Sequence, residues 1–344
     1  MAGPFVGNAW YVAAWSHEVD RSRLFCRSIV GIPMLLYRRG SGEPTCLQDR
    51  CCHRGAPLSK GRREGDDVRC LYHGLKFGSD GRCLEIPGQD RVPKAFRVRS
   101  FQVVERHRWI WVWPGDPDDA DPALIPDCSS LDHPDWVHKP GYLHYEARQD
   151  LIADNLLDFS HVGFVHPTTL GGSERPAQTR VERLPRGVRV ERWQLDDVPA
   201  PYQAQQRDFG GRVDRWNHYD FLLPGVLVMH SGVQAAGTGA PDGRIHDALE
   251  FRACQAVTPE TEHSAHYFFA LPRNFAQQDA SVTEALFENV MTAFEEDRRM
   301  IYAQQRNLAL DPDTPLLAIA ADAALVHYRR VVQQQIAREA RVPA

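Results

Sequence analysis

The segment DRCCHRGAPLSKGRREGDDVRCLYHGLKFGSDG, from Asp49 to Gly81, decides the fold of the first part of the chain. It contains a Cys-x-His motif, Cys51 with His53, and a later Cys-x-x-His motif, Cys70 with His73. Two such motifs on separate loops can close around one metal centre with two thiolates and two imidazoles. This ligand set is typical of a two-iron, two-sulfide cluster in which one iron binds the cysteines and the other binds the histidines.

A structural zinc site of mixed Cys/His type is the alternative. Zinc sites of that type mostly place two cysteines on one loop and two histidines on another, whereas here each loop carries one of each. The spacing therefore favours the iron–sulfur cluster. The neighbouring thiols of Cys51 and Cys52 leave open which of them binds, and the spacing favours Cys51.

The segments CCHRGAPLS and CLYHGLKF resemble the Rieske iron–sulfur proteins. The resemblance implies a [2Fe–2S] cluster, and the positions that match the cluster ligands are Cys51, His53, Cys70 and His73. The sequence departs from the family pattern at Cys52, where the family usually has proline.

The composition limits the possible functions. The 344 residues suffice for two domains, with 43% hydrophobic and 25% charged residues and a net charge of −5. This mildly acidic chain lacks the basic character of nucleic-acid-binding proteins. No apolar run approaches the roughly 18 residues that span a bilayer, and the first residues lack the basic segment of a signal peptide. Because the eight cysteines are sparse, we expect free thiols and a cytoplasmic location.

The fold class expected from these patterns is α+β with two domains. Short strands about every ten residues, with a hairpin at Arg106–Arg108, predict an all-β domain over residues 1–115. The Pro/Asp-rich segment 116–140 predicts a connector. Residues 141–344 combine strand-like runs between 180 and 271 with helices at 281–306 and 318–338. A capping box of Ser281 and Glu284 is expected to start the first of these helices.

A second group of potential metal ligands follows the connector. The segment from Leu151 is predicted to form a helix that ends near Gly163 and Pro167. On such a helix Asn155, Asp158 and His161 share one face. His166 lies five positions after His161, so it joins that face only if the chain bends at Gly163.

Asp297 is the expected third ligand. It falls on the apolar face of the predicted helix 281–306, between Phe294 and Ile301. A carboxylate buried there is costly unless it is paired or binds a cation. Two histidines and one carboxylate form the facial triad of non-haem iron oxygenases, which leaves coordination positions open.

With these residues in place, the resemblance extends over nearly the whole chain. The segments NAWYVAAW, WVWPGDP, DNLLDFSHVGFVH, TPETE and HYFFALPRNF resemble the oxygenase components of Rieske non-haem iron oxygenases, in the group of vanillate O-demethylase and dicamba O-demethylase. The resemblance implies an N-terminal all-β Rieske domain followed by an antiparallel-sheet helix-grip (START-like) catalytic domain. It also implies a mononuclear iron held by His161, His166 and Asp297.

The same resemblance implies a homotrimer in which electrons cross between subunits. Asp158 matches the carboxylate that links His161 to His73 of the adjacent subunit, and Asn155 matches an amide near the iron. The alternative for Asp158 is an acid on a helix face that pairs with a nearby arginine.

The function implied is that of a terminal oxygenase. It would use dioxygen, with electrons from an NADH-dependent reductase or a ferredoxin, to hydroxylate or O-demethylate an aromatic, acidic, methoxylated substrate. A cis-dihydroxylating ring dioxygenase is the alternative, and an electron carrier that uses only the Rieske domain is a third hypothesis. Polar anchors for an acidic substrate are expected among Asn217, His218, His230 and Gln255.

Overall fold

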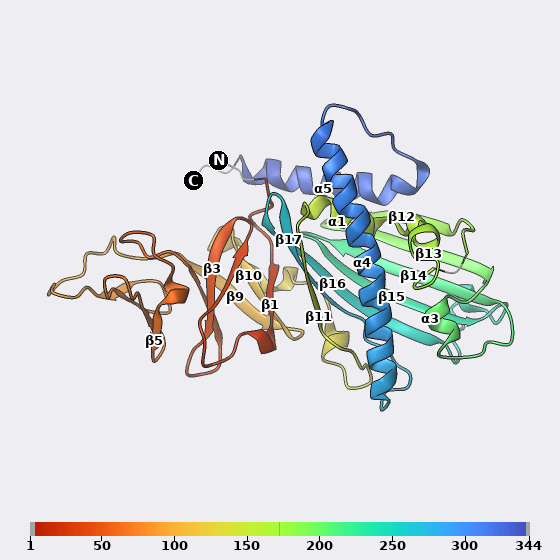
Figure 1. The fold of residues 1–344 in the computed structure, drawn as a ribbon, viewed down its shortest axis with the longest axis horizontal. Helices are drawn as coiled ribbons and strands as arrows, with labels where there is room; N and C mark the ends of the chain where they lie inside the picture. Colours follow the sequence, from red (N-terminus) through yellow and green to blue (C-terminus); the bar gives the residue numbers. More distant parts are fainter. Residues whose placement is uncertain (1–3, 172, 342–344) are drawn as a thin grey trace. The chain divides into compact units, whose positions relative to one another are not determined.

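The computed structural model describes residues 4–171 and 173–341, which divide into two compact units (Figure 1). The first unit comprises the described residues up to Ile125, together with 258–263 and those from Ile336 onward. The second unit comprises the described residues between Pro126 and Val257 and between Ser264 and Gln335. Within the described residues, no helix has the length and apolar character that a membrane crossing requires.

The first unit is built from two antiparallel sheets, which confirms the expected all-β class of this region. The strand order is β1-β10-β9-β4-β3-β2 in the larger sheet and β5-β6-β7-β8 in the smaller one. The strands are β1 Tyr11–Trp15, β2 Phe25–Ile29, β3 Ile32–Arg38, β4 Pro44–Gln48, β5 Arg62–Glu64, β6 Asp67–Arg69, β7 Lys76–Phe77, β8 Cys83–Glu85, β9 Ser100–Arg106 and β10 Trp109–Trp113.

A buried core supports the loops that carry the cysteine and histidine motifs. Cys51 and Cys70 belong to the same buried cluster as Leu58, Leu75 and Phe77. Burial of these apolar side chains is the main favourable contribution to folding in this small region. This core thereby holds the backbone of both loops in place at Cys51 and Cys70.

The second unit contains one seven-stranded antiparallel sheet in the order β11-β17-β16-β15-β14-β13-β12. Helix α4 lies across one face of this sheet, as Figure 1 shows in blue. The strands are β11 Gly141–Tyr145, β12 Gln178–Leu184, β13 Gly187–Asp197, β14 Val213–Leu222, β15 Val226–Ala235, β16 Leu249–Thr261 and β17 Ser264–Ala270. The α-helices are α1 Gln149–Leu157, α2 Val162–Val165, α3 Pro201–Ala204, α4 Ala280–Leu310 and α5 Ala323–Glu339.

Eight short 3-10 helices occur in the described residues. They are η1 Ser16–Glu18, η2 Leu58–Lys60, η3 Pro117–Asp119, η4 Pro122–Leu124, η5 Ser129–Leu131, η6 Phe159–His161, η7 Ala240–Asp242 and η8 Ala320–Asp322. Two of them, η3 and η4, lie in the Pro/Asp-rich segment, where an aspartate side chain caps a turn that begins with proline.

Helix α4 packs on the sheet through its apolar face. The ring of Phe294 lies 5.2 Å from Tyr267 and 4.8 Å from Phe269 on β17, measured between ring centroids. Val290, Ala293 and Ile301 on the same helix are also buried. The helix therefore covers the sheet, as the predicted helix-grip arrangement requires.

The predicted start of this helix was wrong. The N-cap is Asp279 and not Ser281, because the carboxylate of Asp279 accepts hydrogen bonds from the backbone N–H groups of Ser281 (2.9 Å) and Val282 (3.4 Å). Glu284 is not part of a capping box, since its carboxylate pairs with Lys139 instead.

Candidate metal centres

The chain turns sharply where the first ligand segment leaves α1. The predicted helix was too long, because α1 ends at Leu157 and Asp158 adopts an extended conformation with φ −120° and ψ 99°. The carboxylate of Asp158 then caps the following 3-10 turn by accepting from the backbone N–H of Ser160 at 2.8 Å. This break, and not a bend at Gly163, turns His161 and His166 toward the same point.

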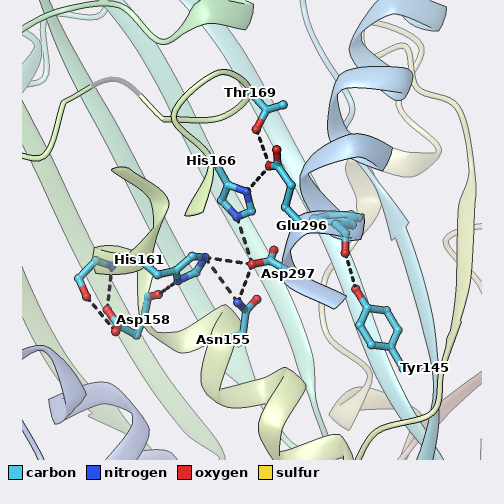
Figure 2. Close-up of polar contacts among 10 residues, drawn as sticks. Tyr145, Asn155, Asp158, His161, His166, Thr169, Glu296 and Asp297 are labelled. Atoms are coloured by element: carbon cyan, nitrogen blue, oxygen red, sulfur yellow. Dashed lines mark hydrogen bonds and ion pairs between the residues drawn. The ribbon is translucent and has the colours of Figure 1, made fainter. Parts of the chain in front are cut away.

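The three predicted iron ligands converge in the second unit. The ligand atoms of His161, His166 and Asp297 all lie within 4.8 Å of one another. The Nε2 atom of His166 is 3.1 Å from Oδ1 of Asp297, and Nε2 of His161 is 3.4 Å from the same oxygen (Figure 2). His166 and Asp297 are 1% and 6% exposed, so the acid on the apolar face of α4 is indeed buried.

The hydrogen bonds of the two Nδ1 atoms fit a metal at this point. Nδ1 of His161 lies 2.5 Å from the main-chain oxygen of Asp158, and Nδ1 of His166 lies 2.8 Å from a carboxylate oxygen of Glu296. Each Nδ1 therefore carries a proton, and in a neutral ring the Nε2 lone pair faces Asp297. Two lone pairs and a carboxylate that face each other need a cation, so this donor set fits a divalent iron.

The pKa values of the two histidines shift in opposite directions at this site. Burial lowers the pKa of His161 below its usual value. Burial acts the same way on His166, but its hydrogen bonds to the carboxylates of Asp297 and Glu296 outweigh burial and raise its pKa. The two carboxylates thus favour positive charge at His166, which is the charge that a bound metal would supply.

Two further side chains position the triad. Asn155 donates from Nδ2 to Oδ1 of Asp297 at 2.8 Å. Glu296 accepts from Thr169 Oγ1 at 3.0 Å as well as from His166. Such a carboxylate behind a histidine ligand fixes the tautomer and the ring orientation. Sequence reasoning missed Glu296, and the available signal was its position directly before Asp297.

The main chain next to Asp297 is also fixed. The hydroxyl of Tyr145 on β11 donates to the main-chain oxygen of Phe294 at 3.2 Å (Figure 2). The hydrogen bond ties α4 to the edge strand of the sheet one turn before Asp297. It thereby limits movement of the carboxylate along the sheet.

The two predicted cluster loops in the first unit have the same backbone geometry. In each loop the cysteine N–H donates to the residue five positions later, Ala56 or Leu75, at 2.8 Å. In each loop the cysteine oxygen also accepts from a glycine N–H at 2.9 Å, and those glycines, Gly55 and Gly74, have φ values of +70° and +78°. Only glycine adopts this left-handed conformation without strain, so both turns are encoded locally.

The side chains on these loops fit a two-iron cluster. Cys51 and Cys70 are 3% and 1% exposed, and the pKa of Cys51 is raised to about 11, first by burial and also by its hydrogen bond to Cys70. His53 and His73 are exposed, with ring centroids 4.5 Å apart. Two thiols in contact and two neighbouring imidazoles, carried by the same two loops, match the donor set of a Rieske cluster. Cys52 is exposed, and it is Cys51 that is paired with Cys70.

A cavity of about 130 Å³ lies beside the triad in the second unit. Its walls are mostly apolar, and they include Leu170, Phe251 and Phe269. Of the predicted polar anchors, the structure brings Asn217 and Gln255 to this cavity. Gln255 is 5% exposed, and its Oε1 accepts from Tyr267 at 2.7 Å.

The other two predicted anchors lie elsewhere. His218 and His230 line a separate depression on the opposite face of the sheet, because neighbouring residues in a strand point to opposite faces. His230 pairs there with Glu250, with 2.6 Å between Nε2 and Oε2. Sequence reasoning also missed three arginines on the cavity wall, Arg192, Arg215 and Arg273.

Comparisons with known proteins match both parts of the chain. Residues 9–101 match the Rieske [2Fe-2S] domain, and residues 145–338 match the vanillate O-demethylase oxygenase C-terminal domain. The iron–sulfur subunit of the toluene-4-sulfonate monooxygenase system of Comamonas testosteroni is 46% identical over 340 residues, covering 97% of this chain and 98% of that protein.

Two other similar proteins support the same relationship. A vanillate O-demethylase oxygenase subunit from a Pseudomonas species is 37% identical over 344 residues, covering 97% of this chain and 96% of that protein. The crystal structure of dicamba monooxygenase bound to dicamba matches with a TM-score of 0.87 at 31% identity, covering 98% of this chain and 99% of that chain.

Proposed function

The chain belongs to the oxygenase components of the Rieske non-haem iron mono-oxygenases, which carry a Rieske [2Fe–2S] cluster and a mononuclear iron, and on that premise we propose that it oxidises an aromatic acid. The reaction is hydroxylation or O-demethylation with dioxygen. Electrons come from a separate NADH-dependent reductase, directly or through a ferredoxin. Toluene-4-sulfonate and vanillate, which appear in the names of two relatives, are both aromatic anions, and this supports the proposed substrate class.

We assign the metal ligands from the donor sets. The proposed cluster ligands are Cys51, His53, Cys70 and His73, and the proposed ligands of the single iron are His161, His166 and Asp297. When bound, the cluster supplies single electrons and the mononuclear iron activates dioxygen, which side chains alone cannot do. The convergence of His161, His166 and Asp297 beside an apolar cavity is the observation that carries the proposed function.

The remaining residues of the site orient these ligands. Glu296 holds the proton of His166 on Nδ1, so that Nε2 stays available for the metal. Asn155 holds Asp297 through its amide N–H. The apolar walls of the cavity exclude water from the side where the substrate binds, which strengthens every charge interaction within it.

We further propose a homotrimer in which Asp158 forms part of a subunit contact. The main-chain oxygen of Asp158 accepts a hydrogen bond from Nδ1 of His161. The carboxylate of Asp158 accepts hydrogen bonds from Ser160 alone among the described residues. In the proposed trimer this carboxylate accepts a hydrogen bond from His73 of the neighbouring subunit, whose imidazole is exposed. The alternative for Asp158 was an ion pair with a nearby arginine. No such ion pair occurs among the described residues, and Arg329 pairs with Asp154.

The proposed domain division is a Rieske domain at 1–115, a connector at 116–140 and a catalytic domain at 141–344. The proposed location is the cytoplasm, which is consistent with the free thiols of all eight cysteines. The electron-carrier hypothesis is not retained, because the similar oxygenase subunits cover both parts of the chain.

Product analysis tests the proposed reaction. The protein is incubated with a reductase, NADH and a panel of methoxylated and methylated aromatic acids, and formaldehyde, hydroxylated products and dioxygen uptake are measured. Formaldehyde from a methoxylated acid, or a benzylic alcohol from a methylated one, supports the proposal. A cis-dihydrodiol would instead assign the dioxygenase alternative, and dioxygen uptake without any oxidised product would contradict both.

A further inference from the structure

Two arginines reach the metal-site cavity from neighbouring strands. Arg192 on β13 lies opposite Asn217 on β14, and Gln194 on β13 lies opposite Arg215 on β14. Because side chains alternate between the faces of a sheet, Arg192 and Arg215 lie on the same face as diagonal neighbours, about 7 Å apart at Cβ. Both line the cavity that also contains His161, His166 and Asp297.

Among the described residues, no carboxylate lies within ion-pair distance of either guanidinium group, although the buried Asp197 acts on both at longer range. In the part of the chain that the structure describes, Arg192 donates to two acceptors, both neutral: Gln194 Oε1 at 3.0 Å and Asn217 Oδ1 at 3.4 Å. Arg215 is 7% exposed, and within residues 4–171 and 173–341 its one hydrogen bond is a long one of 3.5 Å to the main-chain oxygen of Leu170. Among the residues that the structure describes, neither arginine forms an ion pair.

An arginine on the opposite face of the same strand behaves differently. Arg189 on β13 forms a two-point ion pair with Asp220, at 2.7 and 2.8 Å. The chain thus pairs an arginine that is half-exposed to solvent and leaves two more buried ones without a carboxylate in direct contact. Buried cations without a counter-ion are costly, so their retention points to a ligand that supplies the negative charge.

The electrostatic environment of the two arginines also favours a negatively charged ligand. Burial is the main cause that lowers the pKa of Arg192 to about 10, and the positive charge of Arg215 contributes to the same shift. The carboxylates of Asp158 and Asp197 act in the opposite direction but do not outweigh these two causes. Burial also lowers the pKa of Arg215. The two positive charges repel each other in a low-dielectric wall, and an anion placed between them would relieve the repulsion.

We propose that Arg192 and Arg215 together bind the anionic group, sulfonate or carboxylate, of the aromatic substrate. This inference rests on the proposed function, because it assigns the polar end of the substrate within the same cavity. Guanidinium groups present several N–H donors in a plane and bind oxyanions through paired hydrogen bonds. The apolar side chains of Leu170, Phe251 and Phe269 provide the surface against which the ring packs.

The contact of Arg215 with Leu170 connects this anion site to the metal site. Leu170 follows His166 by four residues, and between them Thr169 bonds to the same carboxylate of Glu296 that holds His166. The anionic group therefore binds next to the segment that carries a proposed iron ligand. The distance between the bound anion and the metal site is therefore fixed. This distance determines which carbon of the substrate, counted from its anionic group, reaches the metal site and is oxidised.

Calorimetric titration of the oxidised holoenzyme, without electron donor, tests the anion site directly. The probes are 4-methylbenzenesulfonate, 4-methylbenzoate and the neutral 4-methylbenzenesulfonamide. Arg192→Gln and Arg215→Gln should each weaken binding of at least one anion by about tenfold or more, as expected for loss of a charge-assisted hydrogen bond. Binding of the neutral probe should change by less than about twofold, and Arg→Lys at either position should restore part of the affinity for the anions.

Arg189→Gln on the opposite face is the matched control and should leave all three affinities unchanged. Iron content and the visible spectrum of the cluster verify that each variant is folded and loaded. The anion that binds more tightly to the wild type identifies which oxyanion the pair is built for. Equal weakening of charged and neutral probes, or unchanged anion binding in both Gln variants and both Lys variants, would overturn the assignment.

The two proposals fail in different ways. If the Gln variants lose the anions selectively but the wild type forms no oxidised product from any aromatic acid, the anion site stands and the proposed reaction is wrong. If the wild type oxidises aromatic acids and the variants bind anions normally, the reaction stands and the anion site lies elsewhere.

Discussion

His166 Nε2 lies 3.1 Å from Asp297 Oδ1, although the two residues are 131 positions apart in the sequence. His166 follows the short helix α2 and Asp297 lies near the middle of α4, so packing of the helices against the sheet creates the proposed iron site. Metal binding at this site therefore depends on the tertiary structure as well as on the three ligands.

Replacement of Asp297 by Ala should remove the single iron and leave the cluster intact. The two remaining histidines supply too few ligands to hold the metal tightly, whereas the cluster ligands lie in the other unit. Iron analysis should then give only the two cluster irons per chain. Glu288→Ala, an exposed acid on the same helix, is the control and should retain all the iron. Full iron occupancy in Asp297→Ala would refute the assignment of this ligand.

Replacement of Glu296 by Ala should weaken iron binding without abolishing it. The change removes the carboxylate that holds Nδ1 of His166, and loss of such a partner typically lowers metal affinity by about 10- to 100-fold. Competition with a chelator measures the affinity. The neighbouring Glu295 pairs with Arg298 instead, so Glu295→Ala should behave like the wild type. Equal affinities in the two variants would show that Glu296 does not support the site.

Replacement of Asp158 by Asn should keep both metals and remove most of the turnover. The main-chain contact to His161 is unaffected, while the negative charge available to the neighbouring subunit is lost. Steady-state oxidation of a substrate, with iron content as a check, measures the effect. Ser160→Ala removes only a local hydrogen bond of this carboxylate and should stay active. Normal turnover in Asp158→Asn would mean that the carboxylate does not link the two centres.

Replacement of Asp154 by Asn should change how stability depends on pH. Burial raises the pKa of Asp154 to about 6 from 3.8, even though Arg329 pairs with it and acts in the opposite direction. A raised carboxyl pKa means that the folded state binds more protons, so stability falls as pH rises from about 4 through 6, by roughly 3 kcal/mol. Asp154→Asn should lack this fall.

The difference in the free energy of unfolding between pH 4.5 and pH 7, from urea denaturation, measures this effect. Asp150→Asn changes a more exposed acid of the same helix and should keep the slope of the wild type. If this difference in the free energy of unfolding were the same in Asp154→Asn as in the wild type, it would contradict the effect of burial on Asp154.

The sequence predicted the features whose determinants are local. Both cluster loops could be found because each ligand pair spans only three or four residues and each turn is set by its own glycine, Gly55 or Gly74. Asp297 could be found because an acid on an apolar helix face is costly without a cation. These signals need no knowledge of how distant segments pack.

The missed features depend on packing or on competition between neighbouring groups. The helix break at Asp158 has no glycine or proline to mark it, and it arises because the aspartate caps the next turn. Asp279 caps α4 in place of Ser281 because its carboxylate reaches the first free N–H groups. The faces of β13 and β14 that carry Arg192 and Arg215 follow from which side α4 covers, and the strand sequences alone do not contain that information.

The most direct test of the whole account combines metal analysis with electron paramagnetic resonance of the reduced protein, prepared without oxygen. The account predicts two cluster irons and one further iron per chain, with a Rieske-type signal that Cys51→Ser abolishes and Cys52→Ser retains. A colourless protein without that signal would contradict the account.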